Sequence, residues 1–249
     1  KILIVSGFLG AGKTTFIKRL ARNVDQRFAI LENEYGAAGI DGARLGQNRQ
    51  GTQKNVWEMT EQCICCIGKK DFAASVLTIA NVVDPEYLIV EPTGIGSLAR
   101  IIENLRQIEY ERIQLLSPVT IVDVYSYRRY MAEYPELYQD QIRSADTIIV
   151  SKTEACQAEE KQRIQKFLQE INSQAKIITD YASTMTREDY QSLLLGGRYE
   201  KEVQDTQSGE KMPETFSFEN IRMEAPETLW CFLEQIIRGA FGNIIRAKG

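Results

Sequence analysis

The sequence predicts an α/β fold in which the strands of a mostly parallel sheet alternate with helices. Short apolar runs recur along the 249-residue chain and alternate with segments whose apolar side chains recur at helical spacing. A glycine-rich segment, GFLGAGKT, joins the first apolar run (residues 2–5) to the first helical pattern. Hydrophobic residues make up 43% of the chain, enough for a buried core. We therefore expect a three-layer fold with helices covering the sheet.

Residues 7–14 match the phosphate-binding pattern G-x-x-x-x-G-K-[ST] at every position, which predicts a P-loop NTPase. Glycines let backbone N–H groups turn toward phosphates, Lys13 can reach the outer phosphates, and the Thr14 hydroxyl can ligate Mg²⁺. The alternative is a glycine-rich turn that only joins strand to helix, but a chance match is expected in about one chain in a hundred of this length. The predicted nucleotide-binding residues of this segment are Gly7, Gly10, Ala11, Gly12, Lys13, Thr14 and Thr15.

Composition excludes several classes of partner. Thirty Lys and Arg against 34 Asp and Glu give a net charge of −4 without a basic stripe, so nucleic acid is not expected. No apolar run approaches the roughly 18–20 residues of a membrane span, and no leader-like segment begins the sequence, so we expect a cytoplasmic protein. Because the first residue is Lys1, we expect a few native residues to precede it. The chain has no histidine, so a metal site must use thiolate, carboxylate or water.

Acidic residues follow two predicted strands. Glu32 and Glu34 follow the run 28–31, and we expect them near the phosphates or, alternatively, in a solvated turn. Residues 37–55 lack periodicity and predict a mobile, switch-like loop. The run 87–90 is followed by Glu91-Pro92-Thr93-Gly94. Here Glu91 would hold a water on Mg²⁺, and the Gly94 N–H would meet the γ-phosphate; with Lys13, these form the predicted catalytic set.

Two later strands also end in polar residues. The run 118–123 ends in Asp123, which either lies near the site or caps the next helix. The run 147–150 leads into Ser151-Lys152-Thr153-Glu154, which resembles the guanine-reading motif N/T/S-K-x-D. A carboxylate accepts both N–H donors of guanine, so Ser151, Lys152 and Glu154 favour GTP, although Glu154 is one methylene longer than Asp. The alternative is an ordinary polar turn.

Three of the five cysteines, Cys63, Cys65 and Cys66, lie within four positions at the start of a predicted helix. Such thiols cannot all bridge one another without strain, but three thiolates can converge on one tetrahedral ion, with a fourth ligand from elsewhere. The helix N-terminus lowers thiol pKa values. The alternative is three small buried residues, and this is our interpretation of the isolated Cys156 and Cys231.

The sequence of the C-terminal part predicts a second, smaller structural unit. Residues 200–213 are polar and predict a linker. Beyond them, strand, helix and strand patterns follow, with Phe216 and Phe218 in the first and residues 244–245 in the last. We therefore expect a nucleotide domain at 1–199, a linker at 200–213 and a small, truncated α+β piece at 214–249.

Taken in order, GFLGAGKTT (7–15), LENEYG (31–36), GID (39–41), CICC (63–66), EPTG (91–94) and SKTE (151–154) resemble the motifs of the CobW-type family of metal-trafficking GTPases. The resemblance spans nearly the whole chain and implies a P-loop GTPase fold of the SIMIBI class. It implies Mg²⁺ and GTP or GDP as ligands, with Thr14 and Glu91 serving Mg²⁺. It also implies transition-metal binding, by Zn²⁺ or Co²⁺, at the cysteines with Glu32 as a further ligand.

The implied role is metal insertion, with a recipient metalloprotein or an enzyme of a cobalamin-type cofactor pathway as partner. With no histidine to orient the attacking water, we expect slow turnover without a partner. The sequence leaves open whether a homodimer forms with GTP. Two other classes remain: a small-molecule phosphotransferase, for which no Arg-rich lid is evident, and a nucleotide-binding interaction module with a structural zinc and no significant turnover.

The sequence departs from the family pattern at several positions. Ala37 stands where an acid is frequent, Gln62 where Gly usually precedes the first cysteine, and Glu154 where Asp is usual. Histidine-rich segments are absent. Residues 241–249 resemble the family's C-terminal domain, which normally continues further.

Overall fold

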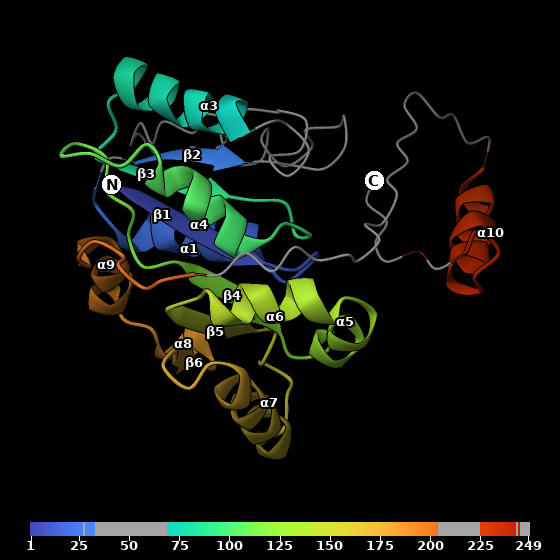
Figure 1. Cartoon of the computed structure of the whole chain (residues 1–249). Coiled ribbons are helices and arrows are strands. Elements are labelled where there is room, and N and C mark those ends of the chain that lie inside the picture. Colours follow the sequence, from blue (N-terminus) through green and yellow to red (C-terminus); the bar gives the residue numbers. More distant parts are fainter. Residues whose placement is uncertain (27, 33–68, 204–224, 243, 245–249) are drawn as a thin grey trace. The chain divides into compact units, whose positions relative to one another are not determined.

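The computed structural model describes residues 1–26, 28–32, 69–203, 225–242 and 244 (Figure 1). The chain divides into two compact units, Lys1–Pro213 and Glu214–Gly249, and each is described by itself. Among the predicted site residues, Glu34 and the three clustered cysteines lie outside the described residues.

The described part of the first unit contains one six-stranded sheet in the order β2-β3-β1-β4-β5-β6, with every neighbouring pair parallel. Strands β2 and β3 lie on one side of β1, and β4, β5 and β6 lie on the other. The direction in which strands are added therefore reverses beside β1. This arrangement confirms the predicted α/β fold. The strands are β1 (Ile2–Gly7), β2 (Phe28–Glu32), β3 (Tyr87–Glu91), β4 (Val119–Asp123), β5 (Thr147–Ser151) and β6 (Lys176–Ile178).

Helices connect the strands and cover the sheet (Figure 1). Those of the first unit are α1 (Lys13–Asn23), α3 (Lys69–Val82), α4 (Leu98–Arg106), α5 (Tyr127–Glu133), α6 (Pro135–Arg143), α7 (Ala158–Ile171), α8 (Tyr181–Thr184) and α9 (Arg187–Leu195).

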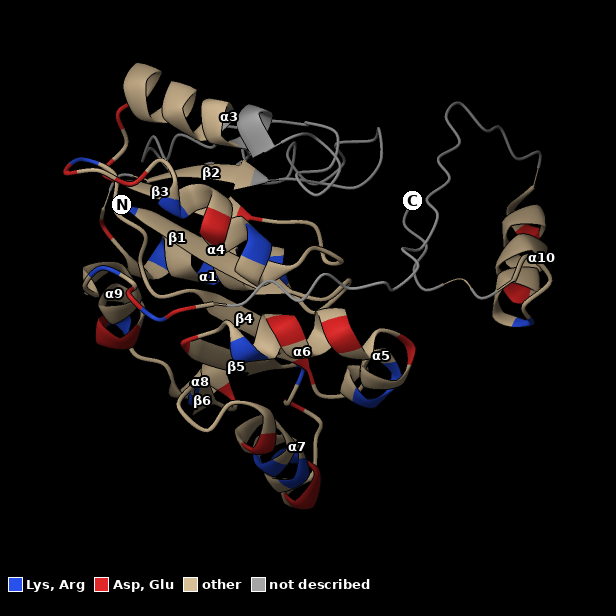
Figure 2. Ribbon diagram, viewed as in Figure 1, with Lys and Arg blue, Asp and Glu red and all other residues tan. Residues whose placement is uncertain are grey.

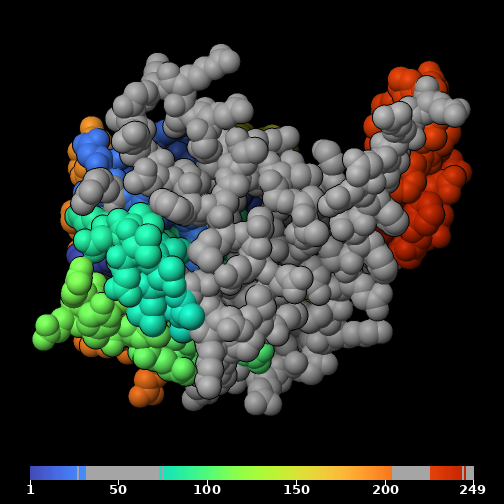
Figure 3. Space-filling view, turned by 90° about the horizontal axis from the view of Figure 1, so that it is seen from above, coloured from blue at the N-terminus to red at the C-terminus, as the bar shows by residue number. Residues whose placement is uncertain are grey.

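The two faces of the sheet carry separate cores. Leu3 and Val5 of β1 belong to the core that contains residues of α1, α8 and α9, whereas Ile2 and Ile4 belong to the core that contains residues of α3 and α4. This division follows from the period of two along a strand, which sends successive side chains to opposite faces. All four side chains are at most 3% exposed. Figure 3 views the molecule from the side on which α3 lies, with α3 in teal at the surface.

The predicted strands at 28–31, 87–90, 118–123 and 147–150 are confirmed to within one residue at each end. The helices expected after the phosphate-binding segment and after the clustered cysteines are confirmed as α1 and α3. Five helices, α4, α5, α6, α8 and α9, were not delineated from the sequence. The predicted strand that contains Phe216 and Phe218 lies outside the described residues, and Ile244 is not in a strand.

The described part of the second unit contains one helix, α10 (Pro226–Ile237). Pro226 lies in the first turn of α10, where a backbone N–H has no partner within the helix, so the lack of an N–H in proline costs no helical hydrogen bond. Its large apolar side chains Leu229, Trp230 and Ile237 are exposed within the described residues. No described helix is long and apolar enough to cross a membrane.

Asn172 fastens the end of α6 to the end of α7. This side chain, 6% exposed, donates through Nδ2 to the carbonyl oxygens of Ile142, Arg143 and Ala145 at 2.8, 3.2 and 2.9 Å. The last carbonyls of a helix have no partner within the helix. The carbonyl oxygen of Ile142 also accepts from the backbone N–H of Ala145 at 3.4 Å, and that of Arg143 also accepts from Lys201 Nζ at 3.0 Å. The Ala145 carbonyl is therefore the acceptor that depends on the Asn172 amide.

We predict that Asn172→Ala lowers the free energy of unfolding by about 1–3 kcal/mol, because the buried Ala145 carbonyl loses its donor. Urea titration followed by circular dichroism measures the effect. The matched control is Ser173→Ala at the neighbouring exposed position, which we expect to stay within about 0.5 kcal/mol of the wild type. Equal stabilities of the two variants would contradict the assignment.

Candidate nucleotide-binding site

The predicted nucleotide-site residues gather at one edge of the sheet. Residues 8–12 follow β1, and Glu91, Asp123 and Ser151 are the last residues of β3, β4 and β5. Because the strands are parallel, their carboxyl ends meet at the same edge, and the winding reverses beside β1. In open α/β sheets such a reversal is where ligands bind.

The loop between β1 and α1 adopts a conformation that depends on glycine. Gly7, Gly10 and Gly12 have φ values of 143°, 72° and 99°. The Lys13 side chain, 7% exposed, turns back over this loop, and its Nζ donates to the carbonyl oxygens of Gly7 at 3.0 Å and Phe8 at 3.5 Å. A buried ammonium group is thereby fixed at the N-terminus of α1, where positive charge and free N–H groups favour an anion.

Gly7 also permits a close approach of two strands. A Cβ at Gly7 would lie 2.4 Å from the carbonyl oxygen of Ile121 on β4. Any side chain here would therefore push β1 away from β4 or distort the start of the loop.

Thr14 and Glu91 join the loop to β3. The Thr14 hydroxyl donates to Glu91 Oε1 at 3.1 Å, with Oε2 at 3.3 Å. The side chains come from the first turn of α1 and the last residue of β3, so two oxygen groups converge beside Lys13. Hydroxyl and carboxylate oxygens are ligands that Mg²⁺ accepts, directly or through water, so this pair fits the predicted metal.

Gly94 presses against the phosphate-binding loop from the side of β3. A Cβ at Gly94 would lie 2.6 Å from the backbone nitrogen of Leu9 and 2.9 Å from its Cα. The segment after Glu91 therefore touches the loop after β1 backbone to backbone. The structure thus brings the segment that contains Glu91 and Gly94 into contact with the loop and helix start that hold Lys13 and Thr14.

Ser151 and Lys152 attach the predicted base-reading segment on the opposite side. The Ser151 hydroxyl, 2% exposed, donates to the carbonyl oxygen of Ala11 at 2.6 Å. Lys152 has a φ of 60°, a conformation that non-glycine residues rarely adopt, and its Nζ contacts Asp123 Oδ2 at 2.7 Å. Backbone strain of this kind costs about 1–3 kcal/mol and persists where surrounding contacts impose it.

Asp123 does not cap the following helix. Its Oδ1 accepts from the backbone N–H of Tyr125 at 2.9 Å, its Oδ2 pairs with Lys152, and the N-cap of α5 is Ser126. Of the two alternatives that the sequence left open, capping is wrong, because the carboxylate reaches across to β5 instead.

Glu154 lies at the surface, and its neighbour Thr153 is 3% exposed. Asp180, at the start of α8, accepts hydrogen bonds from Lys161, at 2.6 Å, and from Thr153, and these lower the pKa of the Asp180 carboxyl below its usual value. The segment is therefore fastened at Ser151, Lys152 and Thr153, while the Glu154 side chain is left exposed.

Aromatic residues that the sequence analysis did not single out support the same loop. Phe8 packs on Tyr130, Tyr134 and Tyr138 at ring-centroid distances of 4.3, 5.5 and 5.5 Å. The Tyr130 hydroxyl donates to the carbonyl oxygen of Leu9 at 3.1 Å. Burial raises the pKa of Tyr138 far above its usual value, so its phenol stays neutral. The segment 125–138 contains five tyrosines, but their spacing carries no signal for this contact.

Residues 1–179 match the family model described as CobW/HypB/UreG, nucleotide-binding domain. The chain belongs to this family. Its zinc chaperone relative YeiR from Escherichia coli is 30% identical over 178 residues, covering 70% of this chain and 53% of that protein. The zinc chaperone CobW of Pseudomonas aeruginosa is 27% identical over 207 residues, covering 71% of this chain and 55% of that protein. The chain thus spans about half the length of these curated relatives.

Solved structures support the family fold. The crystal structure of Zn(II)-bound YjiA GTPase from Escherichia coli has a TM-score of 0.53 and 20% identity, covering 80% of this chain and 65% of that one. The hydrogenase maturation factor HypB from Archaeoglobus fulgidus has a TM-score of 0.54 and 16% identity, and the match covers 78% of this chain and 88% of that one. At such identities the likeness establishes the fold alone.

The predicted transition-metal ligands are outside what the structure describes, apart from the backbone of Glu32. Glu32 ends β2 and is paired in register with Glu91 of β3, which places its Cα beside the nucleotide site. Cys156 is half-buried and Cys231 is exposed, so the interpretation of both as small buried residues is wrong for Cys231. The three clustered cysteines remain a prediction.

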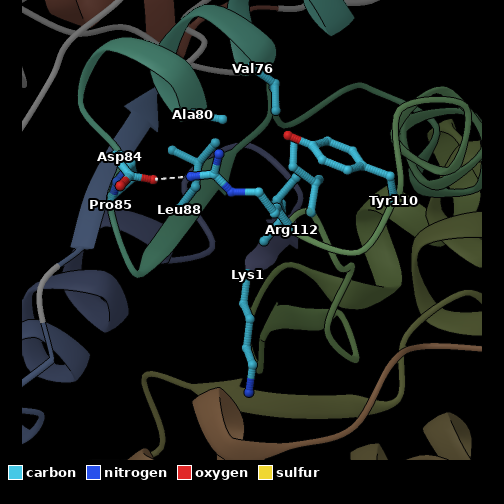
Figure 4. Close-up of a pocket in the computed structure, with 10 residues that line it drawn as sticks. Lys1, Val76, Ala80, Asp84, Pro85, Leu88, Tyr110 and Arg112 are labelled. Carbon is cyan, nitrogen blue, oxygen red and sulfur yellow. Dashed lines mark hydrogen bonds and ion pairs between the residues drawn. The ribbon is translucent and has the colours of Figure 1, made fainter.

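A separate pocket lies at the other edge of the sheet. It is lined by residues of α3, the first residues of β1, Leu88 of β3 and the segment 110–113, with the exposed ion pair Arg112–Asp84 at its rim (Figure 4). It contains none of the predicted nucleotide-site residues. Charges of both signs lie on the described helices, as on α7, which carries Lys and Arg together with Glu (Figure 2).

We predict that Gly94→Ala weakens binding of Mg-nucleoside triphosphate about 5- to 150-fold, because forcing a methyl group against the backbone of Leu9 costs about 1–3 kcal/mol. Calorimetric titration with a non-hydrolysable GTP analogue measures this. The matched control is Gly96→Ala, whose Cβ would meet its nearest neighbours only at 3.4–3.6 Å. Similar affinities for the two variants would show that the contact with Leu9 does not matter for binding.

Proposed function

We propose that this protein is a GTP-hydrolysing metal chaperone. It binds Zn²⁺ or Co²⁺ through Cys63, Cys65 and Cys66 and delivers the ion to a recipient metalloprotein or to an enzyme of a cobalamin-type cofactor pathway. Membership of the CobW/HypB/UreG nucleotide-binding family supports the nucleotide part. The names of two relatives, both zinc chaperones, support the metal part.

The observation that carries the proposal is the hydrogen bond of 3.1 Å between Thr14 Oγ1 and Glu91 Oε1. It brings an oxygen of the phosphate-binding loop and an oxygen of β3 together beside the buried Lys13. When bound there, Mg²⁺ supplies charge neutralisation to the phosphates. Lys13 would bind the outer phosphates, Thr14 would ligate the ion, Glu91 would orient a water on it, and Gly94 would offer its N–H to the terminal phosphate.

Guanine is the base that this site fits best. The Ser151 hydroxyl joins the predicted base-reading segment to the backbone of Ala11. The Lys152 ammonium contacts Asp123, and the aliphatic part of the Lys152 side chain would lie against the base. Glu154 is exposed and free to turn toward the two N–H donors on the Watson–Crick edge of guanine.

Metal binding and nucleotide binding are coupled in this proposal. Glu32 ends the strand beside Glu91 and begins the stretch of chain that leads to the cysteines. If GTP brings Glu32 toward the thiolates, the metal binds more tightly with GTP, and by reciprocity GTP binds more tightly with metal. Hydrolysis then loosens the ion for transfer. A typical coupling of about 1–3 kcal/mol changes metal affinity about 5- to 150-fold.

We predict that Mg-GTP binds in preference to Mg-ATP. Competition against a fluorescent GDP analogue tests this, and displacement by ATP at concentrations equal to GTP would refute the role of Glu154. Glu154→Asp is expected to tighten GTP binding or to leave it unchanged, because the shorter acid has the reach usual in guanine-reading motifs.

Lys13→Ala is expected to lower GTP turnover about 10²–10³-fold, since phosphoryl transfer depends on positioning and charge stabilisation. Glu91→Ala should impair turnover through misplaced Mg²⁺ waters. Phosphate release at saturating Mg-GTP provides the measurement, with the exposed Lys166→Ala on α7 as control. Undiminished turnover in Lys13→Ala would remove the phosphate-binding loop from the reaction.

Cys65→Ser is expected to weaken Zn²⁺ or Co²⁺ binding and to abolish metal-dependent changes in GTP turnover, while basal GTP binding survives because no group of the loop 7–14 has changed. Metal titrations with GDP and with a non-hydrolysable GTP analogue, on wild type and variant, measure both effects. Cys231→Ser, at an exposed cysteine of the second unit, is the control. Identical metal affinities in the two nucleotide states would leave the cysteines as a structural zinc site.

A further inference from the structure

Gln141 of α6 holds the segment that follows Glu91. Its side chain is 1% exposed, and Nε2 donates to the carbonyl oxygens of both Gly94, at 3.2 Å, and Gly96, at 3.0 Å. One amide group thus spans the turn that presses against Leu9 of the phosphate-binding loop. The Oε1 atom of Gln141 has no hydrogen-bond partner among the described residues, so the contribution of this side chain comes from its two N–H donors.

Asp140, the preceding residue of α6, holds the other end of the same segment. Its Oδ2 accepts from the backbone N–H groups of Leu98 at 2.6 Å and Ala99 at 3.4 Å, the first two residues of α4. These N–H groups have no partner within α4. Two consecutive residues of α6 therefore fix the whole stretch from Gly94 to Ala99, and α6 packs against α4 (Figure 1).

Helix α6 is itself attached to residues next to the nucleotide site. The Thr120 hydroxyl of β4 donates to the backbone oxygen of Gln141 at 2.9 Å. Tyr138, one turn earlier on α6, packs on Phe8 of the phosphate-binding loop at 5.5 Å between ring centroids. As a result, α6 contacts the phosphate-binding loop and the Gly94 segment at once, and it fixes the position of one relative to the other.

We propose that Gln141 is a positioning residue for hydrolysis of the nucleoside triphosphate. It acts through the Gly94 carbonyl and sets the distance between the Gly94 segment and the terminal phosphate. This inference rests on the proposed GTP hydrolysis. GDP and GTP differ only in the phosphate that the Gly94 segment would meet, so loss of the two N–H donors weakens GTP binding and turnover and leaves GDP binding in place.

The test compares Gln141→Met, which keeps the approximate volume and removes both donors, with Gln139→Met on the same helix, where the wild-type side chain only accepts from Arg143. Each protein is titrated with Mg-GDP and with a non-hydrolysable Mg-GTP analogue, and kcat and KM are measured for GTP. We expect Gln141→Met to bind GDP within about twofold of wild type and to lose about tenfold in analogue affinity and in kcat/KM, a difference of about 1.4 kcal/mol. Gln139→Met should match wild type throughout.

Equal losses for GDP and the GTP analogue, or no loss for either, would overturn the inference, since both are what a purely structural or an unimportant role predicts. Unaltered GDP binding also shows that Gln141→Met is folded. Should that variant fail to fold, Thr120→Val, which removes only the bond to the Gln141 backbone, must show the same selective loss at smaller size, or the inference fails. A wild-type protein that binds GTP and never releases phosphate overturns the proposed function and, with it, this inference.

Discussion

The structure depends on the close approach of three backbone segments at the carboxyl end of β1. Gly94 lies so near Leu9 that a single methyl group would not fit, Ser151 donates to the Ala11 carbonyl at 2.6 Å, and Lys13 bonds the Gly7 carbonyl. The loop is therefore held from the β3 side, from the β5 side and by its own lysine. Such preorganisation means that an anion meets N–H groups and an ammonium already in position, so binding needs little ordering of the site.

The same contacts determine how the nucleotide can influence the rest of the molecule. Each part of a bound nucleotide would face a different strand end: the phosphates β1, the metal ion and terminal phosphate β3, and the base β5. The β3 side is connected through Gly94 and Gln141 to α6, and Glu91 is paired in register with Glu32 of β2. In the proposed function, a change at the terminal phosphate would therefore act on the side of the sheet that leads in sequence to the cysteines, and the β5 side would recognise the base.

The strands and the loop after β1 could be predicted because their signals are local. An apolar run, a fixed glycine spacing and an acid at a strand end each report on a few adjacent residues. In the structure, Thr14 contacts Glu91, and Ser151 contacts Ala11 in the loop that precedes Lys13. Gln141 and Tyr130 could not be predicted, since they act across more than 40 residues and resemble ordinary helical surface positions in the sequence. Asp123 was ambiguous for the same reason: an acid after a strand can cap a helix or reach a neighbouring strand, and only the adjacency of β4 and β5 decides between them.

Amide hydrogen exchange of the full chain, with Mg-GDP and with a non-hydrolysable Mg-GTP analogue, tests the central claim most directly. The account predicts that both nucleotides protect residues 7–14, and that only the triphosphate analogue adds protection at residues 94–99, because in the proposed function the Gly94 N–H meets the terminal phosphate, which the diphosphate lacks. Equal protection of residues 94–99 by both nucleotides, or protection confined to the pocket around Arg112 at the opposite edge of the sheet, would contradict it.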